Sequence, residues 1–306
     1  MLSFILKRLF LETIPSLLVI ITIAFFLIRL APGGPFSGEK NISPEVLAQL
    51  NTHYGLDKPL YKQYTGYLNN ILHGNFGPSF KYPNRTVTEL IAQAFPVSLE
   101  LGIYALLFAL IVGIAAGILA SLHPNTLSDY LPMSLAMTGI CIPSFVLGPI
   151  FILVFGIWLG WFNVSGWWEP RDRILPAITL GMAYVAYVAR LTRGGMLEML
   201  YQDFIRTARA KGVSEINILL KHALKGGLLP VLSYLGPAAA GLITGSFVVE
   251  TIFQIPGLGR FFIMAAFNRD YTMIMGIVIF YAVLIIVLNT VVDILMTLLN
   301  PKLRLH

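Results

Sequence analysis

The stretch that decides the fold is Leu101–Ser128, which reads LGIYALLFALIVGIAAGILASLHPNTLS and contains no acidic residue, Lys or Arg. A helix of this length crosses the roughly 30 Å hydrocarbon core of a bilayer. The whole chain agrees with it, because 57% of the residues are hydrophobic, only 12% are charged, and the mean hydropathy is +0.77. This balance lies far from that of ordinary globular domains. The sequence therefore predicts an integral membrane protein.

Uncharged runs of this kind recur along the chain. They are Thr13–Ile28, Leu101–Ser128, Tyr130–Trp168, Ile174–Ala189, Gly226–Val249 and Tyr271–Val292. None alternates polar and apolar residues as the strands of a membrane β-barrel do. We therefore expect an all-α integral membrane protein with six transmembrane helices. Pro132, Pro143 and Pro149 interrupt the third run, and Pro230 and Pro237 the fifth, so we expect kinks in both helices.

The distribution of basic residues predicts that both termini are cytoplasmic. This orientation places eleven basic residues inside and only four in the short outer loops, which satisfies the positive-inside rule when the long loop Ala31–Pro96 is discounted. The inner residues are Lys7, Arg8, Arg190, Arg193, Arg206, Arg209, Lys211, Lys221, Lys225, Lys302 and Arg304, and the outer ones are Arg171, Arg173, Arg260 and Arg269. The net charge of +6 follows from this asymmetry, so no nucleic-acid partner is needed to explain it.

We expect three parts along the chain. Residues 1–30 form an N-terminal transmembrane anchor, residues 31–96 a periplasmic loop or cap, and residues 97–300 a five-helix core. A short helix is predicted in the cap, with Ser43 as its N-cap and Pro44 at the first helical position. The core carries amphipathic helices at about residues 201–225.

The segment Arg190–Pro230 is a charged insert between two apolar runs. Asp203 is predicted to be the N-cap of its first helix, with Phe204, Ile205 and Ala208 on one side and Arg206 and Arg209 opposite. Gly212 is predicted to end this helix in the left-handed conformation.

Ser214 is predicted to cap the second helix of the insert. Its apolar residues follow the helical spacing and are Ile216, Leu219, Leu220, Ala223 and Leu224. Two such helices hinged at a glycine could rest on the anionic inner leaflet of the membrane. They could also bind a soluble partner, and the pattern alone leaves both alternatives open.

The run Arg206–Gly212 reads RTARAKG, and His222-Ala223-Leu224 follows at the spacing of the "EAA" loop of binding-protein-dependent ABC importer permeases. Arg206 and Thr207 stand where that family usually has Glu and Ala, and the RTARAKG run resembles its peptide and nickel branch. Further resemblances lie at residues 29–33, 75–79, 250–259 and 268–271. Together they run nearly end to end, and the chain is most similar to B-type permease subunits of bacterial oligopeptide importers.

The resemblance implies a type I ABC importer permease in the bacterial inner membrane, with alternating access driven by ATP. Its partners would be a second, C-type permease subunit, two cytoplasmic ATPase subunits of the D and F types, and a periplasmic A-type peptide-binding protein. The residues that would couple to an ATPase are Asp203, Phe204, Arg206, Thr207, Ala208, Arg209, Ala210, Lys211 and Gly212.

The chain contains no G-x-x-x-x-G-K-[ST] loop, so it lacks the usual means of holding nucleotide phosphates. We expect it to be no enzyme and to bind no cofactor or metal, with ATP and Mg²⁺ bound by the partner ATPases. The kinked helices are expected to line the peptide pathway, with weakly polar groups and one acid at Ser144, Thr244, Ser246 and Glu250. The alternative function is a gradient-driven secondary transporter or channel subunit whose insert only rests on lipid.

Overall fold

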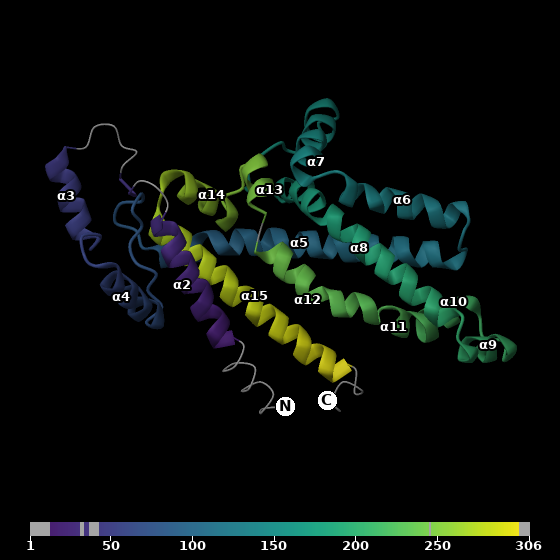
Figure 1. Cartoon of the computed structure of the whole chain (residues 1–306). Coiled ribbons are helices and arrows are strands. Elements are labelled where there is room, and N and C mark those ends of the chain that lie inside the picture. The colour runs from purple at the N-terminus through teal and green to yellow at the C-terminus, as the bar shows by residue number, and fades with distance from the viewer. Residues whose placement is uncertain (1–12, 31–33, 37–42, 245, 300–306) are drawn as a thin grey trace. The chain divides into compact units, whose positions relative to one another are not determined.

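The computed structural model describes residues 13–30, 34–36, 43–244 and 246–299, and every extended regular element within them is a helix (Figure 1). The predicted all-α class is therefore confirmed. The basic residues near both termini that underlie the predicted orientation lie outside this range, so that orientation stays a prediction. The described residues divide into two compact units, one comprising those up to Val97 together with Gly257–Ile286 and the other those of Ser98–Pro256 with the end of the last helix.

The first unit holds the predicted cap and the first apolar helix. Its helices are α2 (Ile14–Leu30), α3 (Pro44–His53), α4 (Leu60–Leu72), the start of α5 (Val87–Leu122), α14 (Leu258–Asn268) and most of α15 (Tyr271–Leu299). Helix α3 starts as predicted, because the Ser43 hydroxyl accepts a hydrogen bond from the Val46 amide at 3.4 Å. The cap is tied to the first helix by a 2.7 Å hydrogen bond between the hydroxyls of Thr22 and Tyr64 and by Phe25, which is fully buried.

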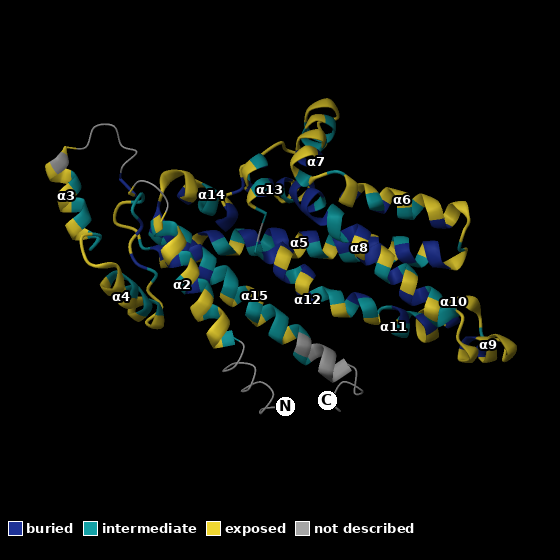
Figure 2. Ribbon diagram, viewed as in Figure 1, coloured by how far each residue is buried: buried dark blue, intermediate teal, exposed yellow. Residues whose placement is uncertain are grey.

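The second unit is built around α8. After the rest of α5 it contains α6 (Leu127–Cys141), α7 (Ser144–Phe151), the π-helix η2 (Ile152–Trp158), the 3₁₀ turn η3 (Pro170–Arg173) and α8 (Ile174–Leu200). It continues with α9 (Asp203–Ala210), α10 (Glu215–Asn217), the π-helix η4 (Ile218–Ala223), α11 (Leu224–Gly227), α12 (Leu229–Ile243) and α13 (Phe247–Ile252). Helix α8 packs against α6, α7, α11 and α12, and it is the most buried of the long helices, as the dark residues in Figure 2 show.

Small residues allow α5 and α8 to pack closely. A Cβ added at Gly117 would lie 2.5 Å from the Cβ of Thr192 and 2.6 Å from the Ala189 carbonyl oxygen, closer than van der Waals contact allows. One turn earlier in α5, Gly113 meets Val188 in the same way. Gly113 and Gly117 thus form a G-x-x-x-G motif, which lets the backbones of two membrane helices approach closely.

The predicted kink in the third apolar run is a complete break. Helix α6 ends at Cys141, α7 begins at Ser144, and their axes differ by 109°. Ile142 has an extended backbone (φ −106°, ψ 116°), the conformation that the ring of Pro143 favours at the preceding residue. Pro143 also has no amide hydrogen with which to continue the α6 ladder.

Four helices among the described residues are long and apolar enough to cross a membrane, or five if the bent α6–α7 pair is one span. The four are Val87–Leu122, Pro170–Leu200, Leu229–Ile252 and Tyr271–Val292. Helix α2 is apolar but shorter, with 17 residues. The predicted count of six therefore remains a prediction.

Candidate functional site

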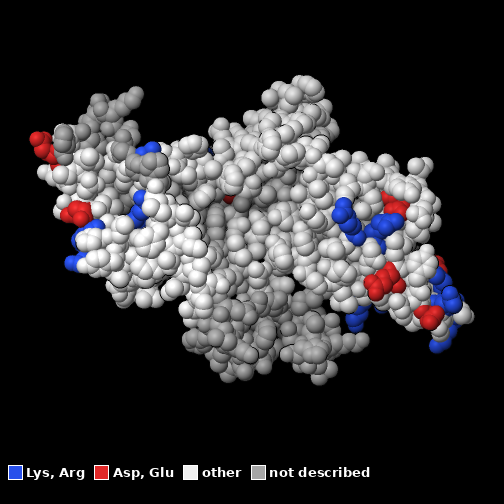
Figure 3. All heavy atoms as spheres, viewed as in Figure 1, with Lys and Arg blue, Asp and Glu red and all other residues white. Residues whose placement is uncertain are grey.

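Helix α9 is amphipathic, and its apolar side is anchored on α8. Ile205 is fully buried and Ala208 is nearly so, and both pack with Met196 of α8 and with Ile218 and Ala223 of η4. Of the nine residues predicted to couple to a partner, all except Ala208 are exposed. On the face that Figure 3 shows, Lys, Arg, Asp and Glu side chains gather over the end of this unit where α9 and α10 lie. The charged side of α9 therefore faces solvent, while its apolar side is packed against α8 and η4.

Two details of the predicted helix are wrong. The N-cap is Gln202, and Asp203 is the first helical residue, where its carboxylate lies at the positive end of the helix dipole. Phe204 does not belong to the buried side, since it is 44% exposed. The apolar stripe of this eight-residue helix is therefore narrower than predicted and consists of Ile205 and Ala208.

Gly212 ends the helix as predicted, with φ +75°, and an ion pair spans the turn that it makes. The Arg209 guanidinium donates two hydrogen bonds to the Glu215 carboxylate, at 2.8 and 3.2 Å. Hydrogen bonding to Arg209 lowers the pKa of Glu215, and the same bond raises the pKa of Arg209. The pair fixes α9 relative to α10 across the glycine.

The buried face of the second helix was predicted only in part. Ser214 is the N-cap as expected, Ala223 is fully buried, and Leu219 and Leu224 pack against the same cluster. Ile216 and Leu220, however, are 70% and 55% exposed, and Ile218, which was not predicted, is fully buried. The cause is the π-helical turn Ile218–Ala223, in which hydrogen bonds join residues five apart. Residues 218 and 223, five positions apart, therefore share a face that the α-helical spacing does not predict.

A second contact joins the insert to α8 through glycines. A Cβ added at Gly195 of α8 would lie 2.2 Å from the carbonyl oxygen of Gly227 in α11, and one at Gly227 would lie 2.6 Å from the sulfur of Met196. The backbones of α8 and α11 therefore touch directly. Helix α9, η4 and α11 all rest on the last two turns of α8.

A buried ion pair lies close to these contacts. Arg193 of α8 donates to both carboxylate oxygens of Asp129 in α6, at 2.7 and 2.6 Å, and the side chain of Asp129 is only 3% exposed. Asp129 also accepts a hydrogen bond from the Asn125 amide at 2.9 Å. This pair was not predicted from the sequence. The available signal was Asp129 itself, an acidic residue directly before the predicted span Tyr130–Trp168, because ionisable residues at membrane helices are functional suspects.

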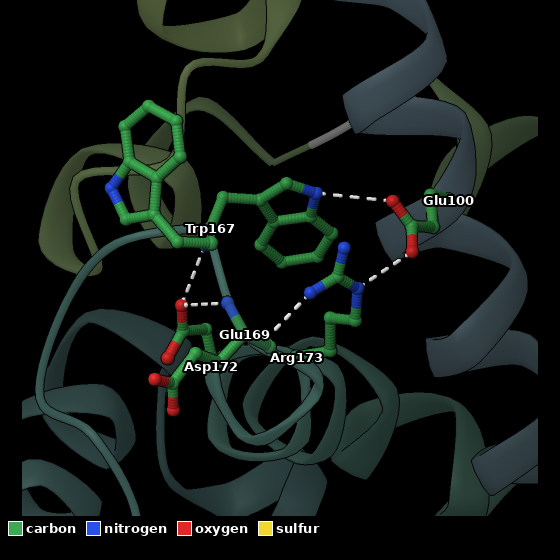
Figure 4. A network of polar contacts seen from close by, with 6 residues as sticks. Glu100, Trp167, Glu169, Asp172 and Arg173 are labelled. Atoms are coloured by element: carbon green, nitrogen blue, oxygen red, sulfur yellow. Dashed lines mark hydrogen bonds and ion pairs between the residues drawn. The ribbon is translucent and has the colours of Figure 1, made fainter.

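A different polar network holds the other end of α8 (Figure 4). Arg173 donates from Nε to Glu100 of α5 at 2.6 Å, and the Trp167 indole donates to the same carboxylate at 3.1 Å. Asp172 accepts hydrogen bonds from the backbone amides of Trp168 and Glu169, at 2.7 and 2.8 Å. This network fixes the loop that leads from η2 into α8.

The four predicted pathway residues occupy different environments. Ser144 lines a cavity of about 270 Å³ at the break between α6 and α7, together with Thr179, Tyr184 and Tyr187 of α8. The hydroxyls of Thr244 and Ser246 bond locally, to the Ala240 carbonyl and the Val249 amide. Glu250 is fully buried and accepts a hydrogen bond from Ser98 at 2.8 Å. Only Ser144 of the four borders this cavity.

Two of the motif segments quoted above meet in the first unit. Asp270, which is 1% exposed, accepts hydrogen bonds from the Ser79 hydroxyl and from the Phe80 amide. Thr272 donates to the Pro78 carbonyl at 2.7 Å. Segments about 190 residues apart in sequence therefore form one polar contact that fixes the cap to the start of α15.

Matches to two protein-family descriptions together cover residues 1–305 of the chain. Residues 87–305 match the family described as binding-protein-dependent transport system inner membrane component, and residues 1–102 match the N-terminal region of such membrane components. The chain belongs to this family. Its charged insert, the ion pairs Arg193–Asp129 and Arg173–Glu100 and the broken α6–α7 helix all lie within the part that matches the inner membrane component.

Individual relatives of this transport-system component are similar over their full length. The chain is 50% identical over 306 residues to the oligopeptide transport system permease protein OppB of Haemophilus influenzae and to that of Escherichia coli K12, covering 99% of this chain and 100% of each relative. It is 43% identical to the dipeptide transport system permease protein DppB of Bacillus subtilis, covering 95% of this chain and 94% of the relative.

Solved structures of ABC transporters share the fold of this inner membrane component. The MetNI methionine ABC transporter in an inward-facing conformation aligns with a TM-score of 0.56 at 15% identity, covering 69% of this chain and 96% of the matched chain. An amino acid ABC transporter crystallised with histidines aligns with a TM-score of 0.51 at 16% identity, covering 70% and 94%. At these identities the likeness concerns the fold alone, and it identifies the type I ABC importer permease architecture.

Proposed function

We propose that the chain is the permease subunit of an ATP-driven, binding-protein-dependent importer of oligopeptides, and that it forms half of the translocation pathway. The observation that carries this proposal is the 50% identity, over the full length of both chains, to relatives named oligopeptide transport system permease proteins. The proposed location is the bacterial inner membrane, which the description of the matched family as an inner membrane component supports. The three-part division into an anchor at 1–30, a cap at 31–96 and a core at 97–300 belongs to the same proposal.

The partners follow from this role. A second, C-type permease subunit would complete the pathway, an A-type binding protein would deliver peptides from outside, and D- and F-type ATPases would bind ATP and Mg²⁺. Helix α9 would dock on an ATPase, since it presents Arg206 and Lys211 to solvent while Ile205 anchors it on α8. A helix that only rested on lipid would turn its apolar side outward, whereas the apolar side of α9 is already covered by protein.

The proposed pathway passes the break between α6 and α7. Ser144 lines the cavity there, and the broken backbone leaves carbonyl and amide groups outside the helical ladder. Thr244, Ser246 and Glu250 are proposed as further pathway residues near the second helix break. Contacts of this kind bind the peptide backbone and not particular side chains, which suits a carrier of varied sequences.

Reconstitution tests the proposal. Liposomes that contain the chain with the proposed partner permease and ATPase subunits are expected to accumulate a labelled tetrapeptide only when ATP and the binding protein are both present. Liposomes that contain the chain alone are the matched control and are expected to accumulate none. Uptake by the chain alone under an ion gradient would refute the proposal and favour a secondary transporter.

A further inference from the structure

One turn of α8, residues 192–196, contacts three other elements of its unit. Thr192 lies against Gly117 of α5, Arg193 holds Asp129 of α6, and Gly195 lies against Gly227 of α11. The next residue, Met196, is fully buried beneath α9. Any displacement of α9 therefore reaches this turn first.

The contact with α6 differs in kind from the other two. Elsewhere along their shared length, Ala136 of α6 packs among Val185 and Ala189 of α8, and Gly139 lies against the backbone of Met182. Van der Waals contacts of this kind keep two helices close but have no donor–acceptor direction. One further polar contact joins the two helices, in which Arg190 donates to the sulfur of Met137 at 3.1 Å, but a thioether sulfur is only a weak acceptor. The two parallel hydrogen bonds from Arg193 to Asp129 have a fixed direction and length.

Asp129 is itself fixed at the start of α6. Its second oxygen accepts the Asn125 amide as well as Arg193, and Asn125 has the left-handed backbone (φ +63°) that turns the chain from α5 into α6. The carboxylate therefore joins the first turn of α6 to α8 at one longitudinal position. From there α6 continues as one α-helix, with Pro132 inside it, to its break before Pro143.

We propose that Arg193 and Asp129 are positioning residues for transport, which set the longitudinal register of α6 on α8. Through this register a displacement of α9 reaches the break at Pro143 and the cavity beside Ser144. The inference rests on the proposed function, because it gives the ATPase-driven movement of α9 a route to the pathway. It assigns the pair no contact with peptide or nucleotide.

The test is the amount of peptide imported per ATP hydrolysed by the complete importer in liposomes. Arg193→Lys keeps the positive charge but cannot form both hydrogen bonds, and Asp129→Asn removes the negative charge. Both are expected to lower the peptide-to-ATP ratio at least about fivefold while ATP hydrolysis per assembled complex stays within about twofold of the parent. The exchanged variant Asp129→Arg/Arg193→Asp is expected to recover part of the ratio.

The matched control is Glu100→Gln, which breaks an ion pair of the same type at the other end of α8. It is expected to keep the peptide-to-ATP ratio of the parent. If Asp129→Asn does not assemble, the double variant Asp129→Asn/Arg193→Gln, which leaves no unpaired buried charge, replaces it with the same expected result. An unchanged ratio, or transport and hydrolysis falling in equal proportion, would overturn the inference.

A direct measurement of register separates this role from general stability. The single cysteine, Cys141, is first replaced by Ser. Spin labels are then attached at Leu131 of α6 and Tyr187 of α8, which are both exposed. The distance between the two labels reports the position of α6 along α8. Arg193→Lys is expected to broaden that distance distribution, and an unchanged distribution would contradict the proposal. A parent importer that moves no peptide with ATP would overturn the proposed function itself.

Discussion

The two ends of α8 are each held by an arginine–carboxylate pair, yet the pairs serve different purposes. At the N-terminal end Glu100 is 36% exposed and its partner Arg173 belongs to a loop that Asp172 and Trp167 also fix. At the C-terminal end Asp129 is 3% exposed and Arg193 joins two helices directly. A partly exposed pair within a loop network fixes local structure, whereas the bidentate pair with a buried carboxylate between two helices is proposed to set their register.

The largest expected effect lies at the C-terminal end, beneath α9. Ala208→Glu places a carboxylate in the buried contact with Met196 and Ile218, where an uncompensated charge costs several kcal/mol. We expect α9 to detach, so that peptide uptake and ATPase recruitment fall to background while the chain still inserts into the membrane. Co-purification of the ATPases measures this, with Ile216→Glu, at a position 70% exposed, as the control that should retain them.

The contact between Gly195 of α8 and Gly227 of α11 allows two neighbouring glycines of one helix, Gly195 and Gly194, to be compared. Gly195→Ala forces a methyl group to within 2.2 Å of the Gly227 carbonyl oxygen, whereas nothing lies within 4 Å of a Cβ at Gly194. Overpacking of this kind costs about 1–3 kcal/mol, and we expect uptake per assembled complex to fall about tenfold, as a loss of 1.4 kcal/mol would give. Gly194→Ala should keep uptake and gain slightly in stability from its helix propensity. Equal behaviour of the two variants would show that the contact is not needed.

At the N-terminal end of α8 we expect a substitution to lower stability without lowering the amount of peptide imported per ATP. Asp172→Ala leaves the amides of Trp168 and Glu169 without their carboxylate acceptor, which costs about 2–3 kcal/mol. The thermal midpoint should fall, while peptide imported per ATP by the remaining complexes stays at the parent value. A lower ratio would mean that both ends of α8 take part in coupling, and the contrast drawn above would be lost.

The smallest effect is expected at the turn between α9 and α10. The pKa of Glu215 is lowered by its hydrogen bonds to Arg209, so the pair's contribution is present above the unfolded pKa of about 4.3 and is lost as pH falls through the lower folded value. At neutral pH Glu215→Gln should reduce uptake less than about twofold, because the pair is exposed and screened by salt. Uptake measured at low and high salt checks this, and a salt-independent loss would point to a direct contact of Glu215 with a partner.

Several features of the fold could be predicted from local sequence because local chemistry decides them. Pro143 breaks its helix, Gly212 ends α9, and Ser43 and Ser214 stand where helices begin. The exposed outer surface of α9 followed from its charged residues. The burial of Ile218 and the exposure of Ile216 and Leu220 could not be predicted, because the π-helical turn changes the spacing on which such a prediction depends.

The amino-acid sequence by itself determined that this is an all-helical membrane protein with a charged insert, since apolar length and charge depend on composition alone. Only the tertiary structure decided which charges pair. Arg193 and Asp129 are 64 residues apart, and nothing local distinguishes Arg193 from Arg190 three positions before it. The pairing is settled when α6 packs along α8, because only there does one carboxylate lie out of water within reach of one guanidinium.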